Sequence, residues 1–174
     1  MHRVLARTAI IVALAWGTSV SAQSIVPGQT RMRVGMTMLT IGPLTDNYVF
    51  VEAFRGMARV TGHVEAGVLA RWVDSSWALV DSQRGVPLSA VTYDYEDGSK
   101  KIEYKSPYLS LGRSTRMMID RVDRDGASRF ALYAVDDARE HHRLYIIMTR
   151  SDVQTLLEAM HGAATGQVTA SQLK

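Results

Sequence analysis

The segment VTYDYEDGSKKIEY, residues 91–104, carries the clearest fold signal in the sequence. Two runs that alternate apolar and polar side chains flank Asp97-Gly98, a pair that favours a two-residue type I′ hairpin turn. Such a turn places Tyr93 opposite Ile102 and keeps the apolar side chains on one face of the hairpin. We therefore expect two antiparallel strands here, joined at Asp97-Gly98.

Two stretches before this hairpin alternate with the two-residue period of a half-buried strand. In residues 31–38 the even positions are apolar, and a change of phase at Met38 predicts a bend before the break at Gly42-Pro43. In residues 58–66 the inner positions carry small side chains, which suit a tightly curved sheet. Both stretches predict strands.

The two remaining segments of this half are also assigned to strands. Residues 48–54 are rich in aromatic and β-branched side chains and indicate a strand, although a cap just before them also allows a short helix. Residues 68–73 and 77–81 predict two more strands. The Asp and Ser side chains of residues 74–76 favour a turn between them.

A second hairpin is predicted by residues 116–122 and 129–135, which flank the sequence DRDG at 123–126. The D-x-D-G spacing also occurs in calcium loops of the EF-hand type. Position 12 of such a loop falls on Leu132 in place of a bidentate Glu, so we interpret the segment as a hairpin turn. Residues 142–149 are apolar on both faces, which is typical of a central strand covered on both sides.

One helix is expected at the C-terminal end of the domain. Ser151 and Gln154 have the spacing of a capping box, and the apolar positions within 153–160 form one helical stripe. We expect Gly162 to end this helix. Residues 163–174 have no period and predict a frayed tail.

Together these elements predict a β-dominated α+β fold, with an antiparallel curled sheet or small barrel of about eight strands and one C-terminal helix. The order of elements resembles that of pleckstrin-homology-like and lipocalin-like architectures. This resemblance covers no motif and implies no functional residue. We expect a single domain at residues 31–162, after a flexible lead-in at residues 23–30.

Residues 1–22 have the pattern of a secretory signal peptide. Arg3 and Arg7 give a positive start, residues 9–16 are apolar, and residues 20–22 are small or β-branched, as before a cleavage site. The apolar run is about half of the roughly 20 residues that span a bilayer, so we expect cleavage and no transmembrane segment afterwards. The expected location is periplasmic or secreted.

Charge and cysteine content exclude several classes of function. Removing the leader leaves 152 of the 174 residues, enough for one domain with its own core. It also removes two of the 20 basic residues and none of the 17 acidic ones, so the formal net charge falls from +3 to +1. We therefore expect no nucleic-acid partner. The absence of cysteine excludes disulfides, thiolate metal sites and cysteine nucleophiles.

No pattern in the sequence predicts a metal site or a cofactor. His63 and Glu65 share one face of a strand, but two ligands are too few to define a site. His141 and His142 would point to opposite faces of a strand and cannot close on one ion. We interpret both pairs as solvated surface residues.

No motif predicts a reaction either. The sequence lacks a G-x-S-x-G elbow, an S-x-x-K pair and a glycine-rich phosphate loop. Acid/base chemistry would need carboxylates such as Glu65, Asp74 and Asp81 to converge in the fold. The sequence therefore leaves catalysis open and favours a protein that is not an enzyme.

Trp72 and Trp77, with Arg71 beside them, are the candidate binding residues. Aromatic side chains near a turn form contact surfaces for sugars or proteins at small entropic cost. The competing interpretation places both indoles in the core. An adaptable apolar pocket is the other candidate site, and its lining would be Met32, Met36, Met38, Met117 and Met118.

The sequence favours a non-catalytic extracytoplasmic domain that binds a protein partner or a component of the cell envelope. One alternative is a carrier of a small apolar ligand or lipid held in a barrel pocket. The other is a small hydrolase, which would need at least three of its Glu, Asp and His candidates in one cleft.

Overall fold

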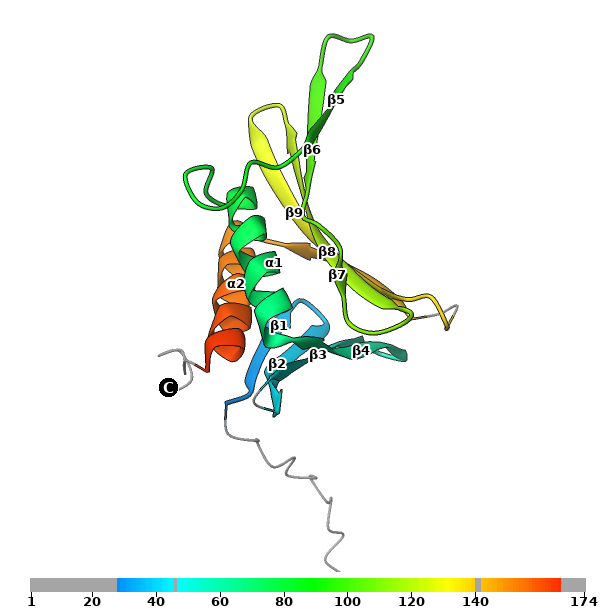
Figure 1. The fold of residues 1–174 in the computed structure, drawn as a ribbon. Helices are drawn as coiled ribbons and strands as arrows, with labels where there is room; N and C mark the ends of the chain where they lie inside the picture. The colour runs from blue at the N-terminus through cyan, green and yellow to red at the C-terminus, as the bar shows by residue number, and fades with distance from the viewer. Residues whose placement is uncertain (1–27, 46, 140–141, 167–174) are drawn as a thin grey trace, which may run out of the picture.

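The computed structural model describes residues 28–45, 47–139 and 142–166. These residues form a β-dominated α+β domain of two antiparallel sheets and two helices (Figure 1). The expected fold class is confirmed at this level. Within the described residues the strands form two open sheets in place of one curled sheet or small barrel. The leader expected at residues 1–22 lies outside the described residues.

The first sheet has four strands in sequence order, each antiparallel to the next. They are β1 (Thr30–Val34), β2 (Thr37–Thr45), β3 (Tyr48–Arg55) and β4 (Ala58–Glu65). The expected strand at residues 48–54 is therefore confirmed over the helical alternative. Since β1 already includes Thr30, the expected lead-in ends before that residue.

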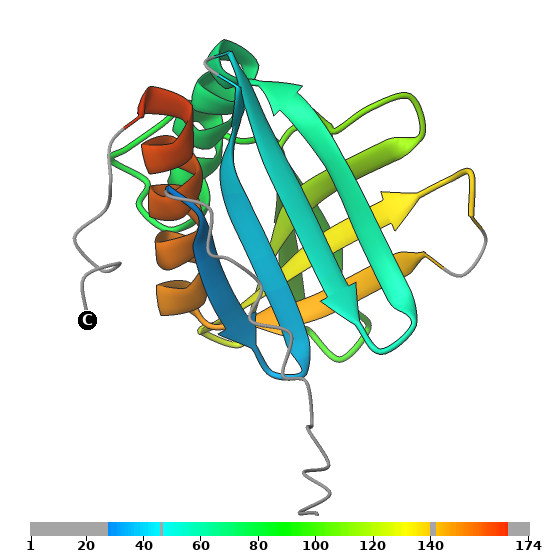
Figure 2. The ribbon, with the colours of Figure 1, turned by 90° about the horizontal axis from the view of Figure 1, so that it is seen from below.

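The second sheet has the order β10-β9-β8-β6-β5, and the short β7 also pairs with β8. The strands are β5 (Ala90–Asp94), β6 (Lys100–Lys105), β7 (Leu109–Ser110), β8 (Thr115–Arg124), β9 (Ala127–Asp136) and β10 (Arg143–Met148). Helices α1 (Ala66–Ser76) and α2 (Arg150–Thr165) pack side by side along one side of both sheets (Figure 2).

The core lies where the inner faces of the two sheets meet the helices. Its fully buried side chains include Leu39, Ile41, Leu69, Ile119, Leu132, Leu144, Leu156 and Leu157. Both sheets and both helices contribute to this set. Each side chain of this size stabilises the fold by about 1.5 to 3 kcal/mol relative to exposure, so the core has no need of disulfides.

Helix α1 corrects the two strands expected at residues 68–73 and 77–81. Leu69, Trp72, Val73 and Ser76 are its buried residues, and their spacing is that of one helical face. Taken alone, the apolar run at 68–73 also fits a short strand. The buried Ser76 beyond it continues the helical spacing. A 3-10 turn at Trp77–Leu79 then extends the helix, where the sequence predicts a second strand.

Residues 31–38 also differ from the expected single strand. Gly35 and Met36 form a two-residue turn between β1 and β2, and Val34 pairs with Thr37 across it. This turn, not a bend at Met38, causes the change of phase in the sequence. Strand β2 then continues through the expected break to Thr45. Pro43 is tolerated there because β1 pairs only as far as Ile41 and leaves one side of β2 free.

The hairpin at residues 91–104 is present, but its expected register is wrong by one residue. Tyr93 pairs with Lys101, not with Ile102, and residues 96–98 form a three-residue loop in which Gly98 has φ +81°. Every residue of β5 is exposed. Because neither face of β5 is buried, burial does not select the register here, and the local turn does.

The second hairpin is confirmed, with the turn at Asp125-Gly126. Both residues have positive φ, as a type I′ turn requires. The expectation for residues 142–149 is wrong in one respect, because β10 is an edge strand. Its inner residues are buried, whereas Tyr145 and Ile147 on the outer face are exposed.

Helix α2 confirms the expected C-terminal helix and corrects both of its ends. Its capping box consists of Thr149 and Asp152, two residues earlier than Ser151 and Gln154. The helix passes through the buried Gly162 and ends at Gly166, which has φ +70°. The tail expected from residue 163 therefore begins later, and residues 167–174 lie outside the described part.

Candidate functional site

A cleft of 840 Å³ lies between the second sheet, the segment after α1 and the start of α2. Leu79, Val80, Phe130 and Met148 line it with buried apolar side chains. Its polar lining residues are Asp81, Ser82, Arg121, Ser128, Arg129, Thr149 and Arg150. An apolar floor with a few polar groups at the rim is typical of a binding cleft, and the volume lies in the usual range of about 300 to 1,000 Å³.

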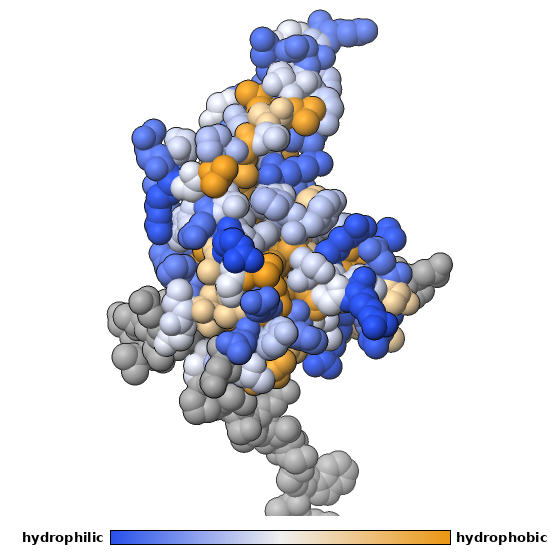
Figure 3. All heavy atoms as spheres, in the orientation of Figure 1, coloured by the Kyte–Doolittle hydropathy of each residue, from blue (hydrophilic) through white to orange (hydrophobic). Residues whose placement is uncertain are grey.

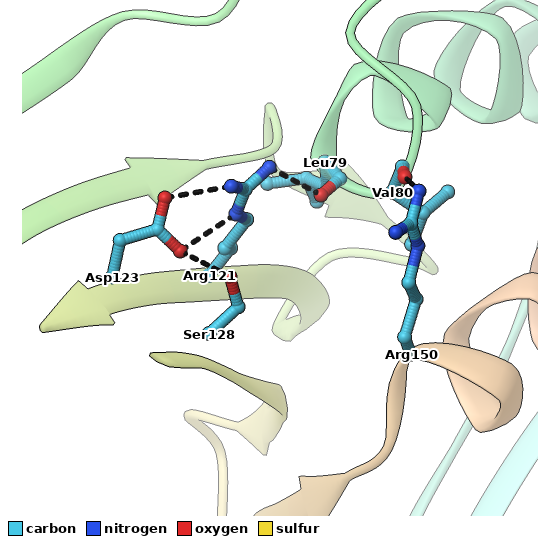
Figure 4. Close-up of polar contacts among 6 residues, drawn as sticks. All are labelled: Leu79, Val80, Arg121, Asp123, Ser128 and Arg150. Atoms are coloured by element: carbon cyan, nitrogen blue, oxygen red, sulfur yellow. Dashed lines mark hydrogen bonds and ion pairs between the residues drawn. The ribbon is translucent and has the colours of Figure 1, made fainter. Parts of the chain in front are cut away.

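Arg121 is held in this cleft by a bidentate ion pair. Its Nε and Nη2 donate to the two carboxylate oxygens of Asp123 at 2.8 and 2.7 Å, and Nη1 donates to the carbonyl of Leu79 at 3.1 Å (Figure 4). The Ser128 hydroxyl donates to the same carboxylate at 2.6 Å. Burial raises the pKa of Asp123, but the hydrogen bonds from Arg121 and Ser128 outweigh it and keep the pKa below its ordinary value.

Arg150 reaches the same segment from the other side. This residue begins α2, and its Nη2 donates to the carbonyl of Val80 (Figure 4). Two arginines from distant parts of the chain therefore bind neighbouring carbonyls at the C-terminal end of the helical segment. Cations are favourable there because these carbonyls carry the negative end of the helix dipole.

Arg129 also borders the cleft, from a position on β9 that pairs with Val122 and faces the side of the sheet opposite to Phe130. It is exposed and forms no ion pair with another residue of the described ranges. Asp81 is the acidic group of the lining, and its carboxylate accepts the backbone N–H of Gln83 at 3.0 Å. The cleft is therefore suited to an acidic group, since a free guanidinium binds carboxylate or phosphate with charge-assisted hydrogen bonds.

The same face of the sheet continues from the cleft into the hairpin of β5 and β6. Arg121 pairs with Phe130 on one side and with Tyr104 on the other, and directly paired residues share a face. The Arg121 guanidinium lies 5.2 Å from the Tyr104 ring centroid. We call residues 90–105 the arm. It projects from the body of the molecule (Figure 1) and carries apolar side chains between its hydrophilic tip and the body (Figure 3).

The candidate binding residues of the sequence lie elsewhere and do not form one surface. Trp72 is only 4 % exposed, and its Nε1 donates to the carbonyl of Pro107 at 2.7 Å. Trp77 is 6 % exposed, with the guanidinium of Arg84 at 3.9 Å from its ring centroid. Arg71 points to solvent from α1. Both indoles therefore fill the core, and neither offers an open face.

The histidine and carboxylate candidates also remain apart. His63 and Glu65 are exposed on β4, and the His63 ring packs edge-on against Tyr48. His142 hydrogen bonds to the carbonyl of Arg59, and its neighbour at position 141 lies outside the described residues. The described residues hold no group of three or more His, Asp or Glu side chains arranged to bind a metal ion.

The methionines proposed for a pocket are dispersed as well. Met117 is buried in the core, Met118 is buried on the outer face of the second sheet, and Met36 is exposed at a turn. Met38 lines a hollow on the outer face of the first sheet. These positions do not enclose a common cavity.

Sequence reasoning did not identify Arg121 or Arg150 as site residues. One signal for Arg121 exists, because it continues the inward-facing alternation of Met117 and Ile119 along β8. A charged residue at a position where the alternation predicts an apolar side chain indicates that the charge has a partner inside the fold. Arg150 has no comparable signal, since only the fold brings α2 next to the segment after α1.

Comparisons with known proteins add no identification. The chain matches no protein-family model, and no curated protein and no solved structure is significantly similar to it. None of the helices in the described ranges is both long enough and apolar enough to cross a bilayer. The fold and the cleft define a β-dominated α+β domain with a basic cleft at the base of a projecting arm.

Proposed function

We propose that this protein is a non-catalytic extracytoplasmic domain that binds a protein partner or a component of the cell envelope. The binding surface is the arm, whose strand β5 is exposed on both faces, together with the cleft at its base. The observation that carries the proposal is that β5 is exposed along its whole length. Strand β5 contributes no residue to the buried core.

The composition of the arm suits a protein interface. Val91, Tyr93 and Tyr95 are exposed on it, with Tyr93 at 42 %. Register places Val91 and Tyr93 on the face of the arm opposite to that of Tyr104. The Lys101 ammonium lies 5.0 Å from the Tyr93 ring centroid, and the Arg124 guanidinium lies 5.4 Å from that of Tyr95. Tyrosine and arginine are enriched at interfaces because they combine large contact area with hydrogen bonding.

The cleft gives this surface chemical selectivity. Its apolar floor accepts an apolar side chain, and Arg129 is available for an acidic group beside it. Arg121 and Arg150 fix the walls of the cleft through Leu79 and Val80. A fixed cleft lowers the entropic cost of binding, so an acidic residue next to an apolar one is the feature that we expect in the partner.

The sequence supports the non-catalytic and extracytoplasmic parts of the proposal. Residues 1–22 have the pattern of a cleaved leader, and the motifs of nucleophilic catalysis are missing from the chain. The expected location is therefore the periplasm or the exterior of the cell.

Affinity capture from envelope extract tests the proposal. The full chain is used as bait in three forms, which are wild type, an arm variant with Tyr93→Ala and Tyr95→Ala, and a control with Tyr145→Ala. Tyr145 is also exposed, at 52 %, but lies on β10, at the edge of the sheet opposite to β5. We expect the wild type and the control to retain one component that the arm variant retains at least about tenfold less, as for loss of an interface hot spot. Equal retention by all three forms would refute the arm as the binding surface.

A further inference from the structure

Two neighbouring hairpin turns of the first sheet present the same pair of residues to solvent. Gly35-Met36 joins β1 to β2, and Gly56-Met57 joins β3 to β4. Both turns lie next to each other at the lower edge of the sheet in Figure 2. Met36 is 80 % exposed and Met57 is 97 % exposed. We call these four residues the twin tip.

The turn geometry explains why both methionines project. Gly35 has φ +58° and Gly56 has φ +59°, whereas the methionine that follows each has negative φ. Glycine with positive φ at the first central position is the feature of a type II′ turn, which leaves the second position open to an ordinary residue. A side chain at this second position of a tight turn has no strand neighbour, so each methionine stands clear of the sheet.

The first outward-facing row of the sheet behind the turns is apolar in the middle and basic at both ends. Register places Arg33, Met38, Phe54 and Arg59 side by side across the four strands. This row lies on the outer face, which carries a hollow lined in part by Met38, Phe54 and Met57. Apolar surface therefore extends from the twin tip onto the sheet, with a guanidinium on each side.

The net charge around the twin tip is positive. Arg31, Arg33, Arg55 and Arg59 are all exposed. Glu52 is the acidic residue among them, and its carboxylate is paired with Arg59. The two turns lie about 10 Å apart, which is two strand spacings, so one flat anionic surface can meet both.

We propose that the twin tip docks this protein on a membrane surface that contains anionic phospholipid. Met36 and Met57 enter the boundary between headgroups and acyl chains, Phe54 and Met38 follow at the headgroup level, and the arginines bind lipid phosphates. Exposed apolar side chains next to guanidinium groups suit this surface, since apolar burial and attraction to anionic lipid act together. The twin tip belongs to the first sheet and the arm to the second, so this docking does not depend on the function proposed for the arm.

Vesicle co-sedimentation of the purified full chain tests the proposal. Vesicles of phosphatidylcholine alone are compared with vesicles that also contain phosphatidylglycerol. One variant carries Met36→Ser and Met57→Ser, a second carries Arg33→Gln and Arg59→Gln, and a control carries Tyr145→Ser and Ile147→Ser. The control removes a similarly exposed apolar pair from the outer face of β10. All forms keep the same N-terminal residues, so any contribution of those residues is common to them.

We expect the wild type and the control to bind the anionic vesicles equally, and the methionine variant at least about tenfold more weakly. The arginine variant should lose the preference for phosphatidylglycerol. Raising the salt from about 0.1 to about 1 M shortens the screening length from about 10 to about 3 Å and should weaken wild-type binding. Circular dichroism confirms that each variant is folded. Equal binding by the methionine variant and the wild type, or no wild-type binding at low salt, would overturn the proposal, while the capture experiment on the arm is unaffected by either result.

Discussion

The indole Nε1 of Trp72 donates a hydrogen bond of 2.7 Å to the carbonyl oxygen of Pro107, and this bond ties α1 to the segment between β6 and β7. The Ser106 hydroxyl donates to the same oxygen at 3.0 Å. A tryptophan considered as a binding residue from its position in the sequence thus has a structural role. It fixes the helix against the sheet that carries the arm.

Replacing Trp72 by Phe tests this role. Phenylalanine keeps part of the packing but has no donor for the Pro107 carbonyl, so we expect the free energy of unfolding to fall by about 1 to 2 kcal/mol. Urea denaturation followed by far-ultraviolet circular dichroism measures the change. Arg71→Ala, at an exposed position of the same helix, should change stability by no more than about 0.5 kcal/mol. Equal effects of the two substitutions would contradict the structural role.

The capping box of α2 gives a second prediction. The Thr149 hydroxyl accepts the backbone N–H of Asp152 at 3.1 Å, and the Asp152 carboxylate accepts the backbone N–H of Thr149 at 2.8 Å. Thr149→Ala should therefore cost about 1 kcal/mol of stability. Ser151→Ala lies inside the helix at an exposed position and should cost almost nothing. The reverse order, measured by thermal or urea denaturation, would place the helix start at Ser151.

Local geometry decided which parts of the fold could be predicted. The turn at Asp125-Gly126 has positive φ at both positions, a conformation that its own residues favour, and the hairpin around it was predicted correctly. Asp97-Gly98 has the same sequence signal, but there the loop has three residues. The Asp97 carboxylate accepts the backbone N–H of Ser99 and stabilises this longer loop. Without a buried face, the flanking residues could not correct the register.

Long-range contacts decided the parts that could not be predicted. The sequence predicts a strand in place of helix α1 because Leu69, Trp72 and Val73 fit a short apolar strand as well as a helical face. It does not predict the cleft, because Arg121 and Arg150 meet the segment after α1 only once both sheets have folded. No spacing of residues along the sequence predicts a contact between such distant segments.

A close approach between β4 and the end of β7 provides a third prediction. A Cβ atom on Gly62 would lie 2.0 Å from the carbonyl oxygen of Leu111, which accepts the backbone N–H of His63 at 3.0 Å. Gly62→Ala must therefore separate the two segments, and we expect a loss of about 2 to 3 kcal/mol. Gly67→Ala is the matched control, because its nearest neighbouring atom would be 3.8 Å away and alanine favours the helix. A Gly62→Ala protein as stable as the control would exclude this contact.

Asp120 gives a prediction about pH. It lies on the outer face of the second sheet, and its buried Oδ1 has no hydrogen-bond partner among the residues that the structure describes. Desolvation raises its pKa above the ordinary value of 3.8; the neighbouring Lys105 acts against this rise and Glu103 adds to it. An acid with a raised pKa binds its proton more tightly in the folded state. Its favourable contribution is therefore complete below pH 3.8 and is lost as the pH rises through the folded-state pKa.

Asp120→Asn should accordingly gain stability relative to the wild type as the pH is raised from about 3 to 7, because the amide never becomes charged. Asp123→Asn should behave in the opposite way. The lowered pKa of Asp123 means that its carboxylate stabilises the fold above the unfolded-state pKa and stops doing so as the pH falls through the folded-state value. Urea denaturation of the three proteins at a series of pH values measures both trends. If the two stability differences changed in the same direction with pH, the assignment of Asp120 as a desolvated acid and Asp123 as a paired one would be wrong.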